Sequence, residues 1–400
     1  MSTWMQAVAT DGPEIRALFT PDGLAVPLVD LAAQQADVHE EVMAGLAEVF
    51  ARASFIGGPE VAEFETAYAE FLDARHCVGV ANGTDALELA LRAGGVEPGG
   101  EVILPANTFI ATAEAVSRIG AVPVPVDVDP DYLLIDPEAV ADAVTSRTQA
   151  IVPVHLFGQT AFVEQLAPIA AACGAVIVED AAQSQGSTRF GRPAGTFGLA
   201  AGTSFYPGKN LGAAGDAGAV VTNDGGVAAR VRMLGSHGSF RKYVHDAVGF
   251  NSRLDTIQAI VLKAKLGRLP SWNLLRRAAA ARYAELLAGI PDLELPHEAP
   301  GNVDVWHLYV VRVPERDSVL SALHDAGIQA GVHYPVPLHL SGAYADRGLR
   351  AASFPVAEEA AGRILSLPLF PHITVEQQER VAEALRGALG YRPGPEDGRT

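Results

Sequence analysis

The sequence predicts an α/β protein in which a mixed, mostly parallel sheet flanked by helices is followed by a smaller α+β unit. From about residue 76 to residue 180, short runs rich in Val and Ile alternate with longer helical segments. This alternation is the pattern of βαβ units. After Gly249 it gives way to a long helical tract. A chain of 400 residues is also long enough for two domains.

The chain is expected to begin with an extension, residues 1–25, that packs loosely on the rest. Residues 31–72 then have a helical pattern, which is broken at the run Phe55-Ile56-Gly57-Gly58-Pro59, because Gly and Pro in succession interrupt helices.

The central part supplies the predicted sheet. Each apolar run is short and is followed by a helical segment, as a buried parallel strand requires. The expected strands are 76–81, 101–106, 121–128, 149–157 and 175–180, with further short strands near 202–206 and 218–222. The expected helices between them are 84–93, 108–120, one near 137–145, and 163–174.

The last third predicts the smaller unit. It contains a helical tract over roughly 255–289, a strand at 306–313, and helices near 317–326 and 374–388. We divide the chain into the extension (1–25), a large domain (26–265) and a small C-terminal domain (266–400). The polar tail after Tyr391 is expected to be frayed.

Composition excludes several functional classes. The net charge of -18 argues against nucleic-acid and anionic-membrane partners, which require a basic face. Cys77 and Cys173 form no CxxC or CxxH pattern, so neither a disulfide framework nor a zinc cage is expected. We find no signal-peptide pattern and no long apolar segment, and the prediction is a soluble, cytoplasmic protein.

Lysine is scarce, which draws attention to Lys209. The other lysines are Lys242, in a polar loop, and Lys263 and Lys265, on a helical tract where a solvated face is the simplest interpretation. Lys209 instead follows a strand and a Pro-Gly turn and precedes a Gly-rich run. A flexible loop at a strand end is a suitable place for a reactive amine.

Two further sites lie between strands and helices. Asp180 ends the run AVIVED, at the edge of the sheet where open α/β proteins bind ligands, although it could instead cap a helix beginning at Ala181. Gly83-Thr84 begins a helix whose free N–H groups suit a phosphate, although Asn82 or Thr84 could simply cap that helix.

Taken in chain order, these features supply what pyridoxal phosphate (PLP) requires. The helix start offers an anion site, Asp180 offers a carboxylate for the pyridine nitrogen, and Lys209 offers an amine for the imine. Neither GxGxxG after the first strand nor GxxxxGK[ST] is present, so a dinucleotide or P-loop function is poorly supported.

The motifs resemble those of fold-type I PLP enzymes, and most of all the DegT/StrS-type nucleotide-sugar aminotransferases. The resemblance runs from about Pro27 to about Leu385. The segments that carry it are VPLVDL (26–31), ANGTDALELAL (81–91), PANTFIATAEA (105–115), VEDAAQSQG (178–186), SFYPGKNLGAAGDAGAVVTND (204–224), GFNSRLDTIQA (249–259), WHLYVVR (306–312), HYPVPLHL (333–340) and LSLPLFPHIT (365–374).

The resemblance implies a role for each matching residue at the cofactor. Lys209 would form the Schiff base and carry the proton, and Asp180 would pair with the pyridine nitrogen. The remaining cofactor contacts would be Phe109 on the ring, Gln183 at the ring hydroxyl, Gly83, Thr84 and Ser204 at the phosphate, and Asn251 reaching the phosphate from a neighbouring subunit. A homodimer with shared active sites is therefore implied.

Substrate contacts and alternatives are less specific. Arg253, His333 and Tyr334 match positions near the sugar nucleotide. His333 and His339 are interpreted as loop histidines without a metal, His155 as a core histidine, and core packing on an apolar helix is the alternative for Phe109.

The implied reaction moves an amino group from L-glutamate to a nucleoside-diphosphate keto-deoxysugar. A dTDP-3-keto-6-deoxyhexose, in amino-sugar and antibiotic biosynthesis, fits the segments best. Amination at C4, a keto-inositol acceptor and a non-catalytic PLP-fold regulator remain alternatives. Gln185, which stands where several C3-acting relatives carry His, keeps the first of these open.

Overall fold

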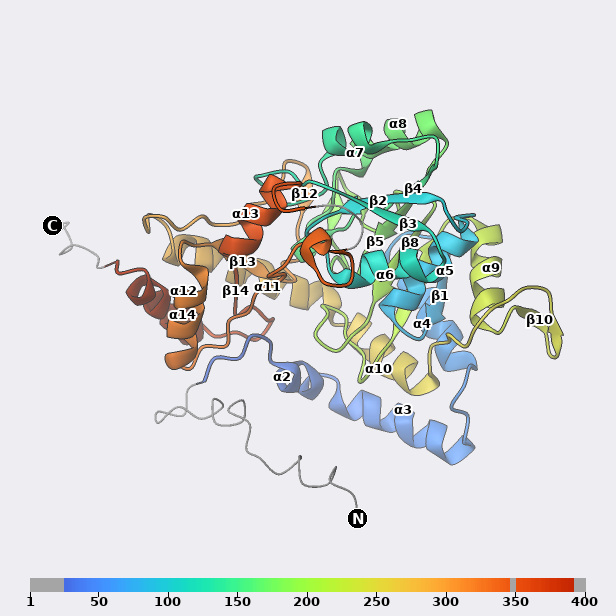
Figure 1. Ribbon diagram of the computed structural model, residues 1–400. Coiled ribbons are helices and arrows are strands. Elements are labelled where there is room, and N and C mark those ends of the chain that lie inside the picture. Colours follow the sequence, from blue (N-terminus) through green and yellow to red (C-terminus); the bar gives the residue numbers. More distant parts are fainter. Residues whose placement is uncertain (1–24, 346–349, 392–400) are drawn as a thin grey trace, which may run out of the picture.

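The large unit is built on one seven-stranded sheet (Figure 1). The computed structural model describes residues 25–345 and 350–391, so nearly all of the predicted extension, and the tail after Tyr391, lie outside the described residues. The order is β1-β9-β8-β5-β4-β2-β3, and β9 runs antiparallel to both its neighbours. The predicted mixed, mostly parallel sheet is confirmed. Its strands are β1 (His76–Val80), β2 (Glu101–Pro105), β3 (Val122–Val126), β4 (Thr148–Ile151), β5 (Val176–Asp180), β8 (Ala200–Ser204) and β9 (Gly218–Thr222).

Helices cover both faces of this sheet because its strands are apolar on both sides. Along β5, Val178 packs into the cluster of one face and Ile177 into that of the other. The first face carries α5 (Gly83–Ala93), α6 (Ile110–Arg118) and α9 (Gly225–Gly235). The second carries α7 (Pro137–Ala143) and α8 (Val163–Cys173), with α4 (Pro59–Phe71) and α10 (Thr256–Leu266) at the β1 end.

The predicted break in the N-terminal helical tract is confirmed. Helices α2 (Leu31–Ala36) and α3 (His39–Arg52) precede it. Gly58 has a φ of 96°, which favours glycine, and Pro59 then opens α4 at its first position, where a missing N–H costs nothing.

The smaller unit packs helices against a two-stranded sheet. It comprises α11 (Leu269–Leu286), β13 (Tyr309–Arg312), α12 (Arg316–Asp325), α13 (Pro355–Arg363), β14 (Ile364–Leu367) and α14 (Val375–Ala388). Sequence patterns did not predict α13 and β14, because β14 follows α13 with no Gly or Pro between them. Val26 bridges to Ile328 and belongs to this unit's core, so the described chain enters the fold through the smaller unit.

Short strands complete the described fold. A three-stranded ribbon joins β6 (Thr188–Arg189), β7 (Arg192–Pro193) and β12 (Asn302–Val303). A hairpin of β10 (Ser239–Arg241) and β11 (Val244–His245) projects from the large unit (Figure 1). Strands of two or three residues give no periodic signal in the sequence.

One prediction about the lysines is wrong. Lys265 does not lie on a solvated helix face; it is only 6% exposed. Its Nζ donates to the carbonyl of Gly212, 2.9 Å away, in the loop after Lys209. Burial lowers the pKa of this amine. Lys263 pairs with Glu63 at the surface, as expected.

No helix among the described residues is long and apolar enough to cross a membrane.

Candidate active site

Asp180, Lys209 and the start of α5 come together at one edge of the sheet. The parallel strands β1, β5 and β8 end there, and α5 begins two residues after β1 leaves the sheet. Because the carboxyl ends of parallel strands share an edge, residues about 100 positions apart in sequence can face one ligand.

Asp180 presents a buried carboxylate with two partners. Its Oδ2 accepts from the hydroxyl of Thr112 at 2.8 Å, and its Oδ1 accepts from the backbone N–H of Ala182 at 3.1 Å. Burial raises the pKa of Asp180, while the Thr112 and Ala182 bonds and the charge of Lys209 oppose that rise. No helix begins at Ala181, where the chain forms turns, so the helix-cap alternative for Asp180 is wrong.

Lys209 lies in a turn just beyond β8, where its backbone N–H donates to the carbonyl of Tyr206 at 2.8 Å. Burial lowers the pKa of the Lys209 amine to about 8, and the carboxylate of Asp180 opposes that shift. A substantial neutral fraction near neutral pH makes this amine able to act as a nucleophile and a base.

The start of α5 forms a close-fitting anion site. Asn82 caps the helix by accepting from the N–H of Asp85 at 2.8 Å, which confirms the capping interpretation for Asn82. Gly83 lies against Ser204: a Cβ at residue 83 would come within 2.6 Å of the Ser204 Cβ. The glycine therefore lets the Ser204 hydroxyl lie beside the helix N-terminus, where free N–H groups attract anions.

Three other predicted residues, Phe109, Gln183 and Tyr334, contact one another. The rings of Phe109 and Tyr334 lie 5.2 Å apart, and the Tyr334 hydroxyl accepts from Gln183 Nε2 at 3.3 Å. Gln183 Oε1 accepts from the backbone N–H of Phe157. Phe109 is the N-cap of α6 and is 51% exposed, so the alternative of core packing on a helix is wrong for Phe109.

Two histidines lie within reach of the Lys209 charge. His333 is one of the predicted residues; its Nδ1 lies 2.8 Å from Ser366 Oγ, and burial lowers its pKa to about 4. His307 was not predicted to have a role, although it lies in the motif WHLYVVR. Thr112 was also missed, because a threonine inside a helix carries no chemical signal in the sequence.

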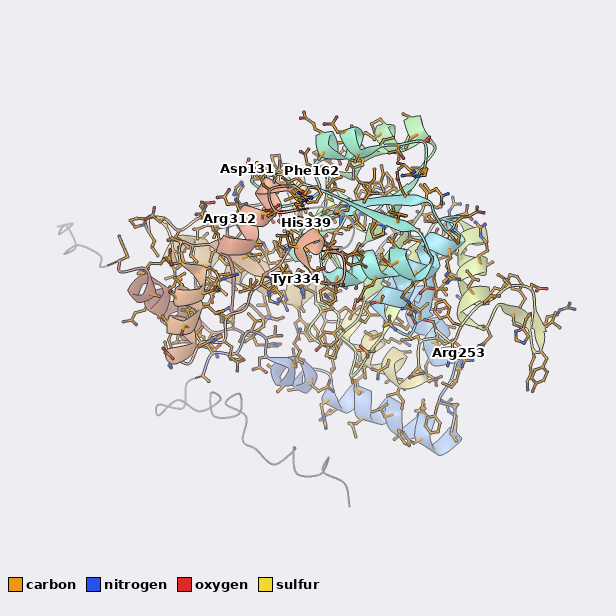
Figure 2. All side chains as sticks on the ribbon, in the orientation of Figure 1. Asp131, Phe162, Arg253, Arg312, Tyr334 and His339 are labelled. Atoms are coloured by element: carbon orange, nitrogen blue, oxygen red, sulfur yellow. The ribbon has the colours of Figure 1, made fainter. Side chains whose placement is uncertain are left out.

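Asn251 and Arg253 are both exposed. Arg253 lies well away from Tyr334 (Figure 2), whereas Asn251 precedes Ser252, whose hydroxyl accepts from the backbone N–H of Ala81 just before α5. The structure brings together the other predicted residues, namely Gly83, Thr84, Phe109, Asp180, Gln183, Ser204, Lys209, His333 and Tyr334, around one sheet edge.

The remaining histidines have structural partners. His155 is fully buried between Glu179, 2.8 Å from its Nε2, and the N–H of Ala161, which confirms it as a core histidine. His339 lies in a single helical turn beside Glu358. Among residues 25–345 and 350–391, no group of three His, Cys, Asp or Glu side chains could hold a metal ion.

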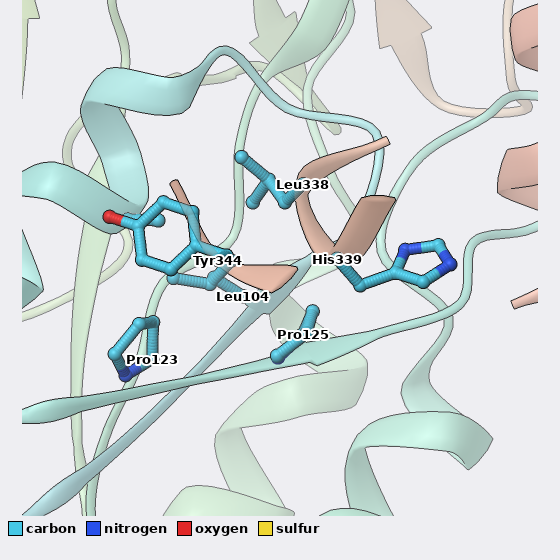
Figure 3. Close-up of a pocket in the computed structure, with 7 residues that line it drawn as sticks. Leu104, Pro123, Pro125, Leu338, His339 and Tyr344 are labelled. Atoms are coloured by element: carbon cyan, nitrogen blue, oxygen red, sulfur yellow. The ribbon is translucent and has the colours of Figure 1, made fainter. Parts of the chain in front are cut away.

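Two partly open spaces can be compared with the cluster. The space between β2, β3 and the segment 338–344 (Figure 3) has a volume of about 10 Å³, far too small for a substrate. The second, about 250 Å³, is bordered by Tyr132, Gln159 and Arg312. Neither is lined by Lys209 or Asp180.

The donor set fits PLP. A buried carboxylate, an amine with a lowered pKa, a helix start with a serine beside it and an exposed aromatic ring match the pyridine nitrogen, the aldehyde, the phosphate and the ring face of that cofactor. Bound there, PLP would supply an electron sink for chemistry at an amine-bearing carbon.

The comparisons with known proteins agree with this geometry. The model of the DegT/DnrJ/EryC1/StrS aminotransferase family matches residues 36–386. The dTDP-3-amino-3,4,6-trideoxy-alpha-D-glucose transaminase of Streptomyces venezuelae is 47% identical over 361 residues, which are 90% of this chain and 95% of that protein.

Two further relatives are similarly close. The Erythromycin biosynthesis sensory transduction protein EryC1 of Saccharopolyspora erythraea is 46% identical over 90% of this chain and 99% of its own. The crystal structure of S. venezuelae DesV in complex with a ketimine intermediate has a TM-score of 0.90 and 46% identity, and covers 92% of this chain and all of that one.

Proposed function

This chain belongs to the DegT/DnrJ/EryC1/StrS aminotransferase family, and from that premise we propose that it transfers an amino group from L-glutamate to the keto group of a dTDP-3-keto-6-deoxyhexose. It is a PLP-dependent sugar aminotransferase. The acceptor follows from the 47% identity to a dTDP-3-amino-sugar transaminase over 90% of the chain.

Each residue at the sheet edge has a proposed task. Lys209 bonds the cofactor and, once released, moves a proton at the reacting carbon. Asp180 holds the proton on the pyridine nitrogen, and Thr112 orients Asp180 through their 2.8 Å hydrogen bond. The N–H groups of Gly83 and Thr84, with Ser204, hold the phosphate, and Phe109 and Gln183 hold the ring.

A homodimer is part of the proposal. Asn251 and Arg253 are exposed, and Arg253 lies away from the cluster of its own chain. The hairpin of β10 and β11 also exposes apolar side chains, Phe240 at 61% and Tyr243 at 82%, and such groups are common at interfaces. In a dimer, Asn251 would reach the phosphate and Arg253 the nucleotide of the neighbouring subunit.

The test is a reverse assay with dTDP-3-amino-3,4,6-trideoxy-α-D-glucose and 2-oxoglutarate. The wild type should form L-glutamate, and Lys209→Ala should lose at least about 10²–10⁴-fold in rate with an unchanged circular dichroism spectrum. Lys263→Ala, at the surface, is the matched control and should keep full activity. A Lys209→Ala protein with the wild-type rate would exclude the assigned lysine.

A regulatory role is the second candidate, because one relative at 46% identity is named a sensory transduction protein. A purely regulatory protein should turn over neither dTDP- nor UDP-linked keto-sugars nor a keto-inositol. L-Glutamate should also not bleach the cofactor's visible absorption band. Bleaching of that band together with turnover of the dTDP sugar alone would exclude the regulator and the other acceptors.

A further inference from the structure

A chain of buried amides runs from the loop after Asp180 to His307, by way of Asn210, the residue that follows Lys209. Asn273 Nδ2 donates to the backbone carbonyl of Gln185 at 2.9 Å. Asn210 Nδ2 donates to Asn273 Oδ1 at 3.1 Å and to the carbonyl of Val305 at 3.0 Å. Asn210 Oδ1 lies 3.0 Å from Nδ1 of His307. Asn210, Asn273 and His307 are at most 8% exposed.

The direction of every bond in this chain is determined. A backbone carbonyl only accepts, so the atom of Asn273 that faces Gln185 must be the amide nitrogen, and the other must be oxygen. The same reasoning at Val305 orients Asn210. Asn210 therefore turns an oxygen toward His307, and the His307 Nδ1 must carry the hydrogen.

The surroundings of His307 also favour its neutral form. Burial lowers its pKa well below the ordinary value, and the charges of Lys209, Arg276 and His333 lower it further. A neutral ring with its hydrogen on Nδ1 has a lone pair on Nε2. Among the described residues this Nε2 has no hydrogen-bond partner, and it is not one of the fully enclosed unpaired atoms.

We propose that His307 is a positioning residue for Lys209, whose ammonium donates to His307 Nε2 whenever the amine is not bonded to the cofactor. This inference rests on the proposed function. Asp180 would then be occupied by the pyridine nitrogen, so the released ammonium needs another acceptor. His333 is less suited, because Ser366 Oγ can donate or accept, which leaves the tautomer of His333 undetermined.

The consequence is a measurable effect on the acidity of Lys209. An acceptor stabilises the ammonium form and raises its pKa. The charged and titratable groups around this pair are Asp180, His333 and Arg276. They remain in a His307→Phe protein, which loses only the acceptor. Its Lys209 should therefore be more often neutral at pH 7.

The test uses the enzyme loaded with pyridoxamine phosphate, in which Lys209 is free whether or not transamination occurs. Acetylation of Lys209 by acetic anhydride is followed by mass spectrometry across pH. His307→Phe should react about 3–5-fold faster at pH 7, which corresponds to a shift of about 0.5–1 in the midpoint. His307→Gln, which retains an acceptor, should return toward the wild-type profile.

Controls separate positioning from packing. His339→Phe removes a buried histidine that lies beside Glu358, and its Lys209 profile should match the wild type. If His307→Phe does not fold, Asn210→Leu is the substitute. It removes the oxygen that fixes the hydrogen on His307 Nδ1, and it should shift the pH profile of Lys209 acetylation in the same direction. Coincident profiles for wild type and His307→Phe, or equal shifts for His307→Phe and His307→Gln, would overturn the inference. Failure of L-glutamate to bleach the PLP form would instead count against the proposed function.

Discussion

Glu179 and Asp180 are neighbours at the end of β5, yet their carboxylates are used in opposite ways. Glu179 is fully buried and its oxygens accept from the N–H groups of Gly195 and Gly198, at 2.8 and 2.7 Å, and from His155. Asp180 accepts one bond on each oxygen and faces Lys209 and the start of α5. Successive strand residues point to opposite faces of the sheet. One acid therefore stabilises the fold, while its neighbour can still accept a hydrogen bond from a ligand.

The contrast shows that the number of hydrogen bonds a carboxylate accepts from the protein, more than its burial, separates a structural carboxylate from one that can bind a ligand. Both side chains are buried. Glu179 accepts three hydrogen bonds from its own fold, whereas Asp180 accepts two and interacts electrostatically with Lys209. Substitutions of the two acids should therefore change different measurements.

Of the substitutions at these acids, Asp180→Asn should have the largest effect. The amide keeps the shape but cannot hold a proton on the pyridine nitrogen, so kcat should fall by about 10²–10³-fold while the unfolding midpoint changes little. Steady-state kinetics and thermal denaturation measure the two quantities. A loss of stability with kcat preserved would reverse the assignment of the two acids.

Glu179→Gln should show the opposite pattern. It replaces one of the two acceptor oxygens with an NH2 group that opposes the N–H of Gly195 or of Gly198, and leaving a buried donor unsatisfied in this way costs about 1–3 kcal/mol. The free energy of unfolding in urea should fall by that amount. Turnover per folded molecule should remain near the wild-type value, and a large loss of kcat in folded protein would contradict the comparison.

Asp304 extends the comparison to a buried carboxylate with little compensation. It is 1% exposed and neither oxygen lies within full hydrogen-bond geometry of a donor; the amide of nearby Asn302 bonds Arg189 and Thr160 and only weakly lowers the pKa of Asp304. Burial, with the charge of Glu298, raises the pKa of Asp304 to about 8. Ionisation therefore costs the folded state, which loses stability as pH rises from about 4 to about 8.

Asp304→Asn should remove that loss. The variant should match the wild type near pH 4 and exceed it by about 1–3 kcal/mol at pH 8, measured by urea unfolding across pH. Asp142→Asn, at an exposed position on α7, is the control and should show no such trend. Equal stability of Asp304→Asn and wild type at pH 8 would mean that the Asp304 carboxylate has a partner in solution.

The sheet and the core of the site could be predicted because their signals are local. Most strands of the sheet follow from short apolar runs between helical segments, although β8 (AAGTS) has no Val or Ile, and Lys209 and Asp180 were predicted from their places at strand ends. The predicted cluster of Gly83, Thr84, Ser204, Phe109 and Gln183 is also brought together in the structure. Strands of two or three residues and helix α13 carried no comparable signal.

What the sequence by itself determined about this protein is the order of its main elements and its family, and it predicted Lys209 and Asp180 as the reactive residues. Only the tertiary structure decided that Glu179 is held by Gly195, Gly198 and His155, that Lys265 is buried against the Lys209 loop, and that Asn210 orients His307. The last two outcomes depend on contacts between residues that are 50 to about 100 positions apart. A sequence pattern specifies which face of a strand or helix is apolar, but it does not specify which distant hydrogen-bonding group that face will meet.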